Sequence, residues 1–242
     1  MSLISLIKEL KKIANSDKAL ILSRFFKTGR GQYGENDKFL GLTVPQQRAI
    51  AQRYYQNLSL FDIKKLLAEP YHEMRLTGAL ILVAKYQQAR QTNNQTEQKI
   101  IFSFYFNNST AFNNWDLVDL TAEKIMGDYL LNQPKHQVNQ LLNQLAQANN
   151  LWSRRISMVA TYAFIKNNKF DQTIRLAEIL LNDQHDLIHK AVGWMLREVG
   201  KRNKKILLNF LNKHLKQMPR TTLRYAIEKF SETLRQKYLK NN

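Results

Sequence analysis

The sequence predicts an all-α protein in which pairs of helices stack as an α-solenoid. Helical periodicity runs through almost the whole chain, and segments with the alternating pattern of a strand are almost absent. Long helices are expected to start 36, 35 and 33 residues apart, near Trp115, Leu151, Asp186 and Pro219. A shorter partner helix follows each of the first three, at about 136–147, 169–182 and 203–216. Helix pairs that recur with a period in the thirties are typical of a solenoid.

Residues 1–15 are expected to form the first helix. Their apolar side chains recur at helical spacing and lysines close the last turn. They contain no continuous apolar stretch and no small-residue cleavage site, so a signal peptide is not expected. Prolines fall near the first turns of later helices, where a missing N–H is tolerated: Pro45, Pro70 and Pro219. We expect residues 1–242 to form one repeat domain, in which small rotations between repeats create a concave cleft.

The segment 151–166 is apolar on nearly every side apart from Arg154 and Arg155. A helix of this kind is buried by neighbours on both sides, as an inner helix of a solenoid would be. Each arginine on it needs a negative partner, which is either a carboxylate of the protein or a phosphate of a ligand. Both alternatives remain open from the sequence.

The charge of the chain indicates an anionic partner. Lys and Arg number 37 against 19 Asp and Glu, which gives a formal net charge of +18. From Lys190 onward there are 14 basic and 3 acidic residues. Such an excess stabilises neither core nor helices, so nucleic acid is the favoured partner and the predicted cleft is expected to be basic. The alternative is a protein that is merely basic.

Composition excludes several classes of protein. The chain has no cysteine, which rules out disulfides and zinc or iron–sulfur sites with cysteine ligands. Its longest apolar run, residues 78–84, is too short to span a membrane. The cytoplasm is the expected location.

The helix expected at 186–202 has two faces. Its apolar positions recur at i, i+4, i+7 and i+11 in Ile188, Val192, Met195 and Val199. A second row repeats with the same spacing about 120° away, in Lys190, Trp194, Arg197 and Lys201. A tryptophan in a row of cations is typical of a surface that holds a polyanion and places a ring against part of it.

Trp115 and Asp119 lie one turn apart at the start of another expected helix and therefore face the same way. They flank an apolar stripe formed by Val118, Ala122, Ile125 and Tyr129. Asp116 is interpreted as a capping carboxylate at the positive end of the helix dipole. Asp119 is too far along the helix for that role. Its bland interpretation is a salt bridge to Arg154 or Arg155, and its functional interpretation is a fixed carboxylate that stabilises developing positive charge. Both can hold, because an arginine can orient the carboxylate without neutralising it.

A glycine-rich stretch, residues 28–41, interrupts the helical pattern. Gly29–Gly34 matches G-x-G-x-x-G, but the match follows a helical segment rather than a strand, so a dinucleotide site is not expected. A flexible basic loop is expected instead, in which Arg30 and Lys38 approach a phosphate backbone.

The sequence contains no conventional nucleophile and no convincing metal site. His185 and His189 have the i, i+4 spacing of paired metal ligands, but a third ligand of the right kind is missing and the surrounding chain is basic. A solvated helix start is the favoured interpretation of this pair. No metal and no cofactor are therefore expected.

Several segments are familiar in combination: NNWDLVD, LWSRRIS, HKAVGWMLRE, MPRTTLRYAIEKF and the early FFKTGRGQYGENDKFLGLTVP. Over essentially the whole chain the sequence resembles the AlkD family of alkylpurine DNA glycosylases. The resemblance implies a HEAT-like α-solenoid that holds duplex DNA in a concave basic cleft. It also implies excision of bases alkylated to a cationic form, such as 3-methyladenine and 7-methylguanine, without flipping them into a pocket.

By position, the resemblance implies roles for five residues. Trp115 and Trp194 match the two tryptophans that pack against the deoxyribose of the lesion, and Asp119 matches the catalytic carboxylate. Arg155 matches the arginine that accompanies this site, and Arg197 matches a basic DNA contact. Arg154, Lys190 and Lys201 are expected to contact DNA as well.

The chain departs from the family pattern at one point. Better-known members have an aromatic hydroxyl early in the chain, where this sequence has Phe25 or Phe26 and a longer glycine-rich loop.

The charge and the resemblance together predict a monomeric glycosylase that acts on duplex DNA containing alkylated bases. A non-catalytic module of the same fold that recognises distorted or branched DNA is the alternative. A scaffold for an acidic protein is a third possibility, but it does not account for a tryptophan beside a carboxylate.

Overall fold

The computed structural model describes residues 2–241, and the regular elements in that range are helices. The predicted all-α helical-repeat fold is thus confirmed. Between residues 2 and 241 the only strand-like pairing is an isolated bridge between Lys38 and Tyr71. No helix in the same range is long and apolar enough to cross a membrane. The chain forms two compact units, residues 1–121 and residues 122–242.

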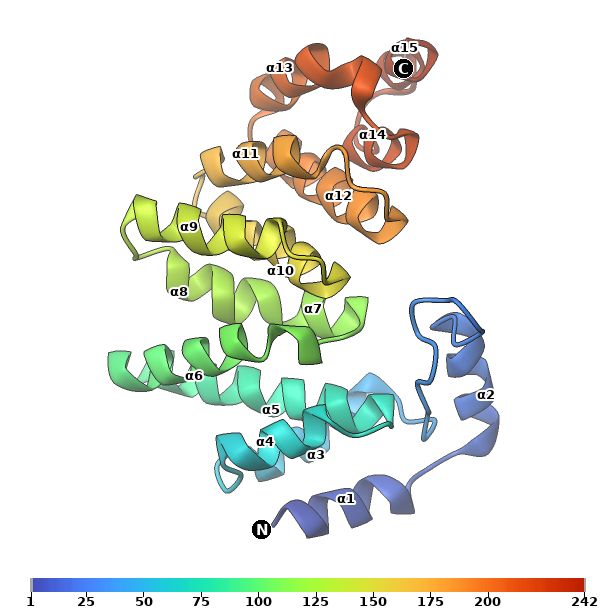
Figure 1. The fold of residues 1–242 in the computed structure, drawn as a ribbon, viewed down its shortest axis with the longest axis vertical. Coiled ribbons are helices and arrows are strands. Elements are labelled where there is room, and N and C mark those ends of the chain that lie inside the picture. Colours follow the sequence, from blue (N-terminus) through green and yellow to red (C-terminus); the bar gives the residue numbers. More distant parts are fainter. Residues whose placement is uncertain (1, 242) are drawn as a thin grey trace. The chain divides into compact units, whose positions relative to one another are not determined.

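The first unit, drawn from blue to green in Figure 1, is built around one long helix. Its elements are α1 (Leu3–Lys12), α2 (Ser16–Phe25), α3 (Val44–Tyr54), α4 (Leu60–Leu67), α5 (His72–Gln91), α6 (Gln95–Asn107), the 3₁₀ turn η1 (Ser109–Ala111) and α7 (Trp115–Thr121). Helix α5 packs against α3, α4, α6 and α7, and most of its side chains are buried. It is the central element of this unit.

The helix starts of the first unit follow local capping signals. The side chain of Ser2 accepts the backbone N–H of Ser5 in α1, and Ser59 forms the same reciprocal arrangement with Asp62 in α4. Pro45 lies in the first turn of α3, as expected. At Gly41, φ is +83°, and a Cβ there would lie 2.0 Å from the carbonyl oxygen of Asn15. Only glycine fits where the loop crosses the start of α2.

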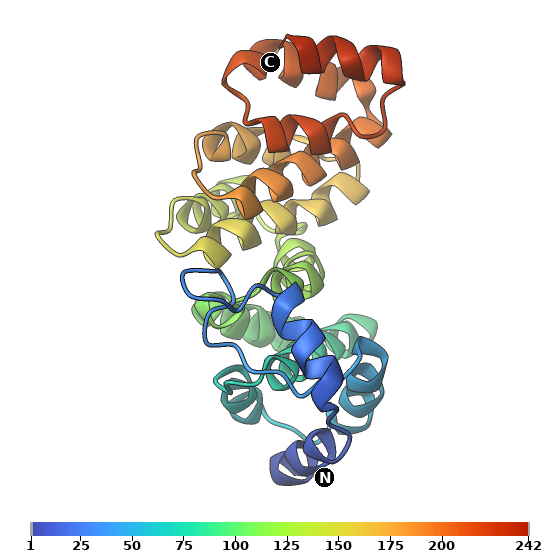
Figure 2. The same ribbon diagram turned by 90° about the vertical axis from the view of Figure 1, so that its right-hand side faces the viewer.

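The second unit continues with stacked helices, drawn from green to red in Figures 1 and 2. Its elements are the π-helical turn η2 (Ala122–Gly127), α8 (Asp128–Leu130), α9 (Lys135–Ala146), α10 (Leu151–Lys166), α11 (Asp171–Leu180), α12 (Asp186–Arg202), α13 (Lys204–His214), the 3₁₀ turn η3 (Leu215–Gln217), α14 (Arg220–Ala226) and α15 (Glu232–Lys240). Helices α7, α10 and α12 begin at the predicted residues, and Pro219 is the N-cap of α14.

Helix α10 is the inner helix that its composition predicts. It packs against η2 and α9 and also against α11 and α12. Its start is fixed by Asn150, whose side chain accepts the backbone N–H groups of Trp152 and Ser153, each at 3.0 Å. Burial on both sides explains why the helix carries so few polar side chains.

The apolar stripe expected along residues 118–129 is wrong at its last member. The backbone forms a π-helical turn over Ala122–Gly127, which adds one residue to the turn. Beyond Ile125 the buried apolar side chains are those of Met126 and Leu130, whereas Tyr129 stays partly exposed. Local periodicity contains no signal for this change of phase.

Candidate functional site

Trp115 is the first residue of α7 and is held on three sides. Its backbone N–H donates to Oδ1 of Asn114 at 2.8 Å. Its indole Nε1 donates to the hydroxyl of Tyr33 at 3.1 Å. The ring of Phe26 stacks on the indole, with the centroids 5.4 Å apart and the planes 22° from parallel. The Trp115 residue is partly exposed.

Asp119 lies one turn further along α7 and is partly exposed. The helix is α-helical between the two residues, so Trp115 and Asp119 are on the same side of it, as predicted. Burial raises the pKa of the nearby Tyr105 hydroxyl, and the charge of Asp119 raises it further. Tyr105 therefore stays protonated beside this carboxylate.

Asp116 has a role that the sequence interpretation missed. Its Oδ1 accepts the backbone N–H of Leu117 at 2.9 Å, and its Oδ2 forms a hydrogen bond with Nε2 of His72 at 2.8 Å. The other nitrogen of His72 lies 3.7 Å from Oδ2 of Asp37 in the glycine-rich loop. Asp37 also binds Arg75, with 2.7 Å between Oδ1 and Nη2. Asp116 thus ties the start of α7 to α5 rather than only capping a helix.

The four charges of this cluster stabilise one another in a buried environment. Burial would lower the pKa of His72, but the hydrogen bond to Asp116 and the proximity of Asp37 raise it to about 9. Burial would raise the pKa of Asp37, but His72 and Arg75 outweigh this effect and hold it below its ordinary value of 3.8. At neutral pH His72 is therefore protonated and Asp37 is ionised.

We predict that alkaline pH weakens the first unit through His72. Because the pKa of His72 rises from 6.5 to about 9 on folding, its contribution is complete below pH 6.5 and is lost as the pH rises through 9. The loss should be roughly 2–3 kcal/mol in the free energy of unfolding. Urea unfolding of wild type and His72→Gln between pH 6 and 10 measures it. The stability difference between the two proteins should shrink with rising pH, and a constant difference would contradict the prediction.

The expectation of a flexible glycine-rich loop is wrong for its second half. The buried carboxylate of Glu73 accepts three consecutive backbone N–H groups, from Leu40 at 2.9 Å, Gly41 at 2.8 Å and Leu42 at 3.2 Å. The backbone of Lys38 bonds to Pro70 and His72. The side chains of Arg30 and Lys38 are exposed, and Lys38 belongs to the anchored half of the loop.

Trp194 in the second unit lies on the partly exposed side of α12. The apolar row of α12 is buried, whereas Lys190, Trp194 and Arg197 are partly exposed and Lys201 is exposed. The ring of Tyr162, on α10, lies 6.0 Å from the indole at an angle of 48°. Trp194 and Tyr162 together form an aromatic surface that the sequence analysis did not anticipate.

Cations surround this aromatic surface. Nζ of Lys166 lies 5.0 Å from the Tyr162 ring centroid, and the Arg202 guanidinium lies 5.9 Å from it. The signal for Lys166 and Tyr162 was available, because both lie on one face of α10 with Arg155, at i+7 and i+11. The apolar character of the rest of α10 obscures this row of polar side chains.

The cations of α12 have acidic partners within the protein. Lys190 pairs with Asp186 at 2.8 Å. Arg197, Lys201 and Arg202 surround Glu198, and Arg197 also binds Glu228. Glu198 is buried, and its single negative charge is shared among three cations, of which Arg197 also has Glu228 as a partner. Phosphates can therefore compete for these side chains.

Arg154 and Arg155 both reach the segment that leads into α12. Arg154 binds Asp183 at 2.6 Å and donates to the backbone of Ala148 and Asn149. Arg155 is buried and donates to the carbonyl oxygen of Leu187 at 2.6 Å. The intramolecular alternative is therefore observed for Arg154. Contact of either arginine with DNA stays a prediction.

His185 and His189 form hydrogen bonds with backbone groups at the start of α12. Nδ1 of His185 accepts the N–H of Leu187 at 3.1 Å, and His189 hydrogen-bonds with the carbonyl oxygen of Asp183. The side chain of His185 is the N-cap of α12. Among residues 2–241 there is no cluster of three or more potential metal ligands.

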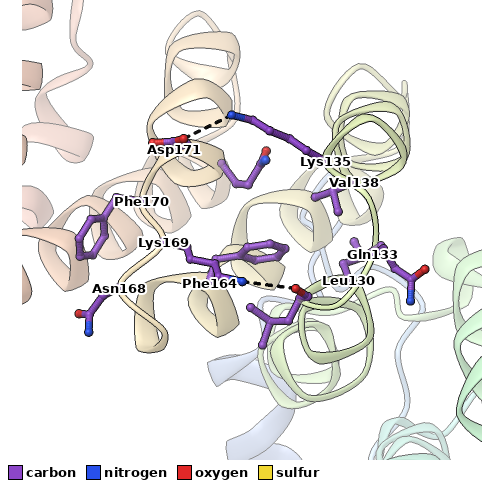
Figure 3. Close-up of a pocket in the computed structure, with 11 residues that line it drawn as sticks. Leu130, Gln133, Lys135, Val138, Phe164, Asn168, Lys169, Phe170 and Asp171 are labelled. Atoms are coloured by element: carbon purple, nitrogen blue, oxygen red, sulfur yellow. Dashed lines mark hydrogen bonds and ion pairs between the residues drawn. The ribbon is translucent and has the colours of Figure 1, made fainter. Parts of the chain in front are cut away.

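A cavity of about 370 Å³ lies in the second unit between α8, α9 and the turn that connects α10 to α11 (Figure 3). Its wall includes Leu130, Val138 and Phe164, and a surface pair of Lys135 and Asp171, 3.5 Å apart, lies at its edge. None of the predicted site residues lines it. The candidate surfaces are those around Trp115 in the first unit and around Trp194 in the second.

The predicted site residues divide between the two units. Trp115 and Asp119, with the loop cations Arg30 and Lys38, belong to the first unit. Trp194, the two arginines of α10 and the cations of α12 belong to the second. The convergence of the two tryptophans and Asp119 in one groove stays a prediction.

Phe25 and Phe26, the early aromatic residues, both contact Trp115. Phe26 is buried and stacks on Trp115, whereas Phe25 is 61% exposed and contacts the indole edge-on at 6.0 Å. The hydroxyl that reaches Trp115 comes from Tyr33 in the glycine-rich loop. No local pattern points from residue 33 to residue 115.

A family profile decides the assignment. The profile described as DNA alkylation repair enzyme matches residues 6–230. The chain belongs to the DNA alkylation repair enzyme family. No curated protein matches this family member at a significant level.

Three solved structures share the fold of this DNA alkylation repair family member. A predicted DNA alkylation repair enzyme from Enterococcus faecalis is 15% identical, with a TM-score of 0.68 over 90% of this chain and 97% of that one. The smu.31 protein from Streptococcus mutans UA159 is 15% identical, with a TM-score of 0.56 over 78% and 93%. AlkD2 from Streptococcus mutans is 14% identical, with a TM-score of 0.54 over 89% and 98%.

Proposed function

We propose that the protein is a monomeric DNA glycosylase. It hydrolyses the N-glycosidic bond of cationic alkylated purines, of the 3-methyladenine and 7-methylguanine type, in duplex DNA without flipping the base. Membership of the DNA alkylation repair family supports this proposal. The observation that carries it is the pair of Trp115 and Asp119 on one side of α7, with the indole held by Phe26 and Tyr33.

The chemistry suits these residues. Alkylation at N3 or N7 leaves the purine with a positive charge, so the base departs as a neutral molecule when it takes the electrons of the glycosidic bond. The sugar that remains resembles an oxocarbenium ion. Asp119 stabilises this positive charge and orients a water molecule. The water oxygen bonds to C1′ and gives up a proton to bulk water, so the products are the neutral free base, an abasic site and a solvated proton.

The aromatic side chains support the same step. The electron-rich faces of Trp115 and Trp194 attract a cationic sugar, with an energy on the order of 1–2 kcal/mol each when water is excluded. Cations bind phosphates on either side of the lesion. They are Arg30 and Lys38 on the glycine-rich loop, and Lys190, Arg197 and Lys201 on the helix of Trp194. These contacts position the duplex without reading its sequence.

Base release tests the proposal directly. Purified protein is incubated with a duplex that contains 7-methylguanine, and free base is measured against the rate of spontaneous loss. Release well above background is expected. The alternative is a module that binds DNA without excision, which is favoured by Phe25, an exposed phenyl ring without a hydroxyl beside Trp115. Binding without release would support that module.

Salt dependence distinguishes DNA binding from a protein scaffold. Because the proposed contacts are mainly to phosphates, the affinity for a duplex should fall by about 100-fold or more between 50 and 200 mM salt. Fluorescence anisotropy of a labelled duplex measures this change. An affinity that is insensitive to salt would contradict the phosphate contacts and favour a protein partner.

A further inference from the structure

The glycine-rich loop contributes a side chain to the candidate site. The hydroxyl of Tyr33 accepts the indole N–H of Trp115 at 3.1 Å, although the two residues are 82 positions apart. The face of the same indole stacks on Phe26. A stacking contact opposes tilt of the ring, and a hydrogen bond at Nε1 opposes its rotation about the Cβ–Cγ bond. Together they define the plane and the direction of the indole.

Tyr33 is itself held in a closed turn. On one side, the backbone N–H of Gly29 donates to Oε1 of Gln32, and that of Gly31 donates to Oε2 of Glu35. On the other side, the N–H of Gly34 donates to the carbonyl oxygen of Lys27 at 3.2 Å. A Cβ at Gly34 would lie 2.4 Å from the carbonyl oxygen of Phe26, so the loop lies tightly against the end of α2.

The loop beyond Tyr33 is anchored by charge. Asp37 binds Arg75 and lies near His72, and the amide of Asn114 donates to Asp37 at 3.3 Å. Asn114 directly precedes Trp115 and accepts its backbone N–H. The loop is thus attached both to the backbone at Trp115 and to the indole ring. A site that must meet a transition state benefits from such prior order.

We propose that Tyr33 is a positioning residue, which holds the Trp115 indole in the orientation that meets the deoxyribose of the lesion. The inference rests on the proposed function and adds to it a role for loop 28–41. Tyr33 acts through Trp115 rather than on the reacting atoms. Its loss should therefore affect the excision step more than the affinity for DNA.

The test compares wild type with Tyr33→Phe, which keeps the ring and removes the acceptor. The indole Nε1–H signal of Trp115 is followed by NMR and assigned with Trp115→Phe. In Tyr33→Phe this signal should shift and exchange faster with water, while the signals of Trp152 and Trp194 stay in place. Single-turnover base release should slow by about 5- to 30-fold, with the Kd for the duplex within about threefold of wild type.

Tyr55→Phe is the matched control, because Tyr55 is a partly exposed tyrosine of the same unit whose hydroxyl accepts from its neighbour Gln56. It should change neither the indole signal nor the rate. An unchanged Trp115 signal in Tyr33→Phe would overturn the inference whether or not the protein excises bases. A shifted signal with an unchanged rate would also overturn it, provided that wild type is active. If the wild-type protein released no base, this result would count against the proposed function. The indole signal alone would then test whether Tyr33 positions Trp115.

Discussion

Replacing Asp119 by asparagine should slow base release from 7-methylguanine duplex by about 100-fold or more. Asparagine has the same shape but lacks the charge that stabilises the oxocarbenium-like sugar. The affinity for DNA should stay within about threefold, because the carboxylate does not attract phosphates. Single-turnover release with excess protein measures the first quantity, and fluorescence anisotropy measures the second.

Asp171→Asn is the control for this measurement. Asp171 is a carboxylate at the start of α11 whose side chain is 85% exposed, so its replacement should leave release unchanged. Thermal unfolding of both variants checks that the fold is intact. If Asp119→Asn retained activity within twofold of wild type, Asp119 would not be the catalytic carboxylate.

Replacing Glu73 by alanine should lower the free energy of unfolding by about 3–5 kcal/mol. The carboxylate is 1% exposed and accepts the N–H groups of Leu40, Gly41 and Leu42. Alanine would leave these three donors without an acceptor in a buried environment. Urea unfolding measures the loss, and hydrogen exchange at residues 40–42 shows whether it arises at these amides.

Glu73→Gln provides a milder version if the alanine variant does not fold. One amide nitrogen would then face backbone N–H donors, so a loss of about 2 kcal/mol is expected. Glu232→Gln is the matched control, because its side chain is 67% exposed at the start of α15 and should cost almost nothing. A loss below about 0.5 kcal/mol in Glu73→Gln would show that the glutamate does not anchor the loop.

The elements that the sequence predicted well are those with local signals. Helices α7, α10 and α12 begin where an asparagine or a histidine side chain accepts a free N–H of the first turn. The burial of α10 and the two faces of α12 follow from periodicity over four turns. Such signals are complete within about 15 residues, so they can be read without knowledge of the rest of the fold.

The contacts that organise the candidate site have no such signal. Asp116 meets His72 across 44 positions, Glu73 meets Leu40 across 33, and Tyr33 meets Trp115 across 82. Each residue alone has an ordinary local interpretation, such as a helix cap, a surface acid or a loop aromatic. Only the packing of α5 between the loop and α7 makes them partners.

The sequence by itself determined the all-α repeat fold, the excess of positive charge, and the faces on which Trp115, Asp119 and Trp194 lie. The tertiary structure decided that the glycine-rich loop is anchored by buried charge, that Tyr33 binds Trp115, and that Tyr162 extends the surface of Trp194. The physical reason is the separation along the chain between the residues that interact. Periodicity and capping act within one helix, whereas a buried charge or indole N–H takes whichever partner the folded chain brings within about 3 Å.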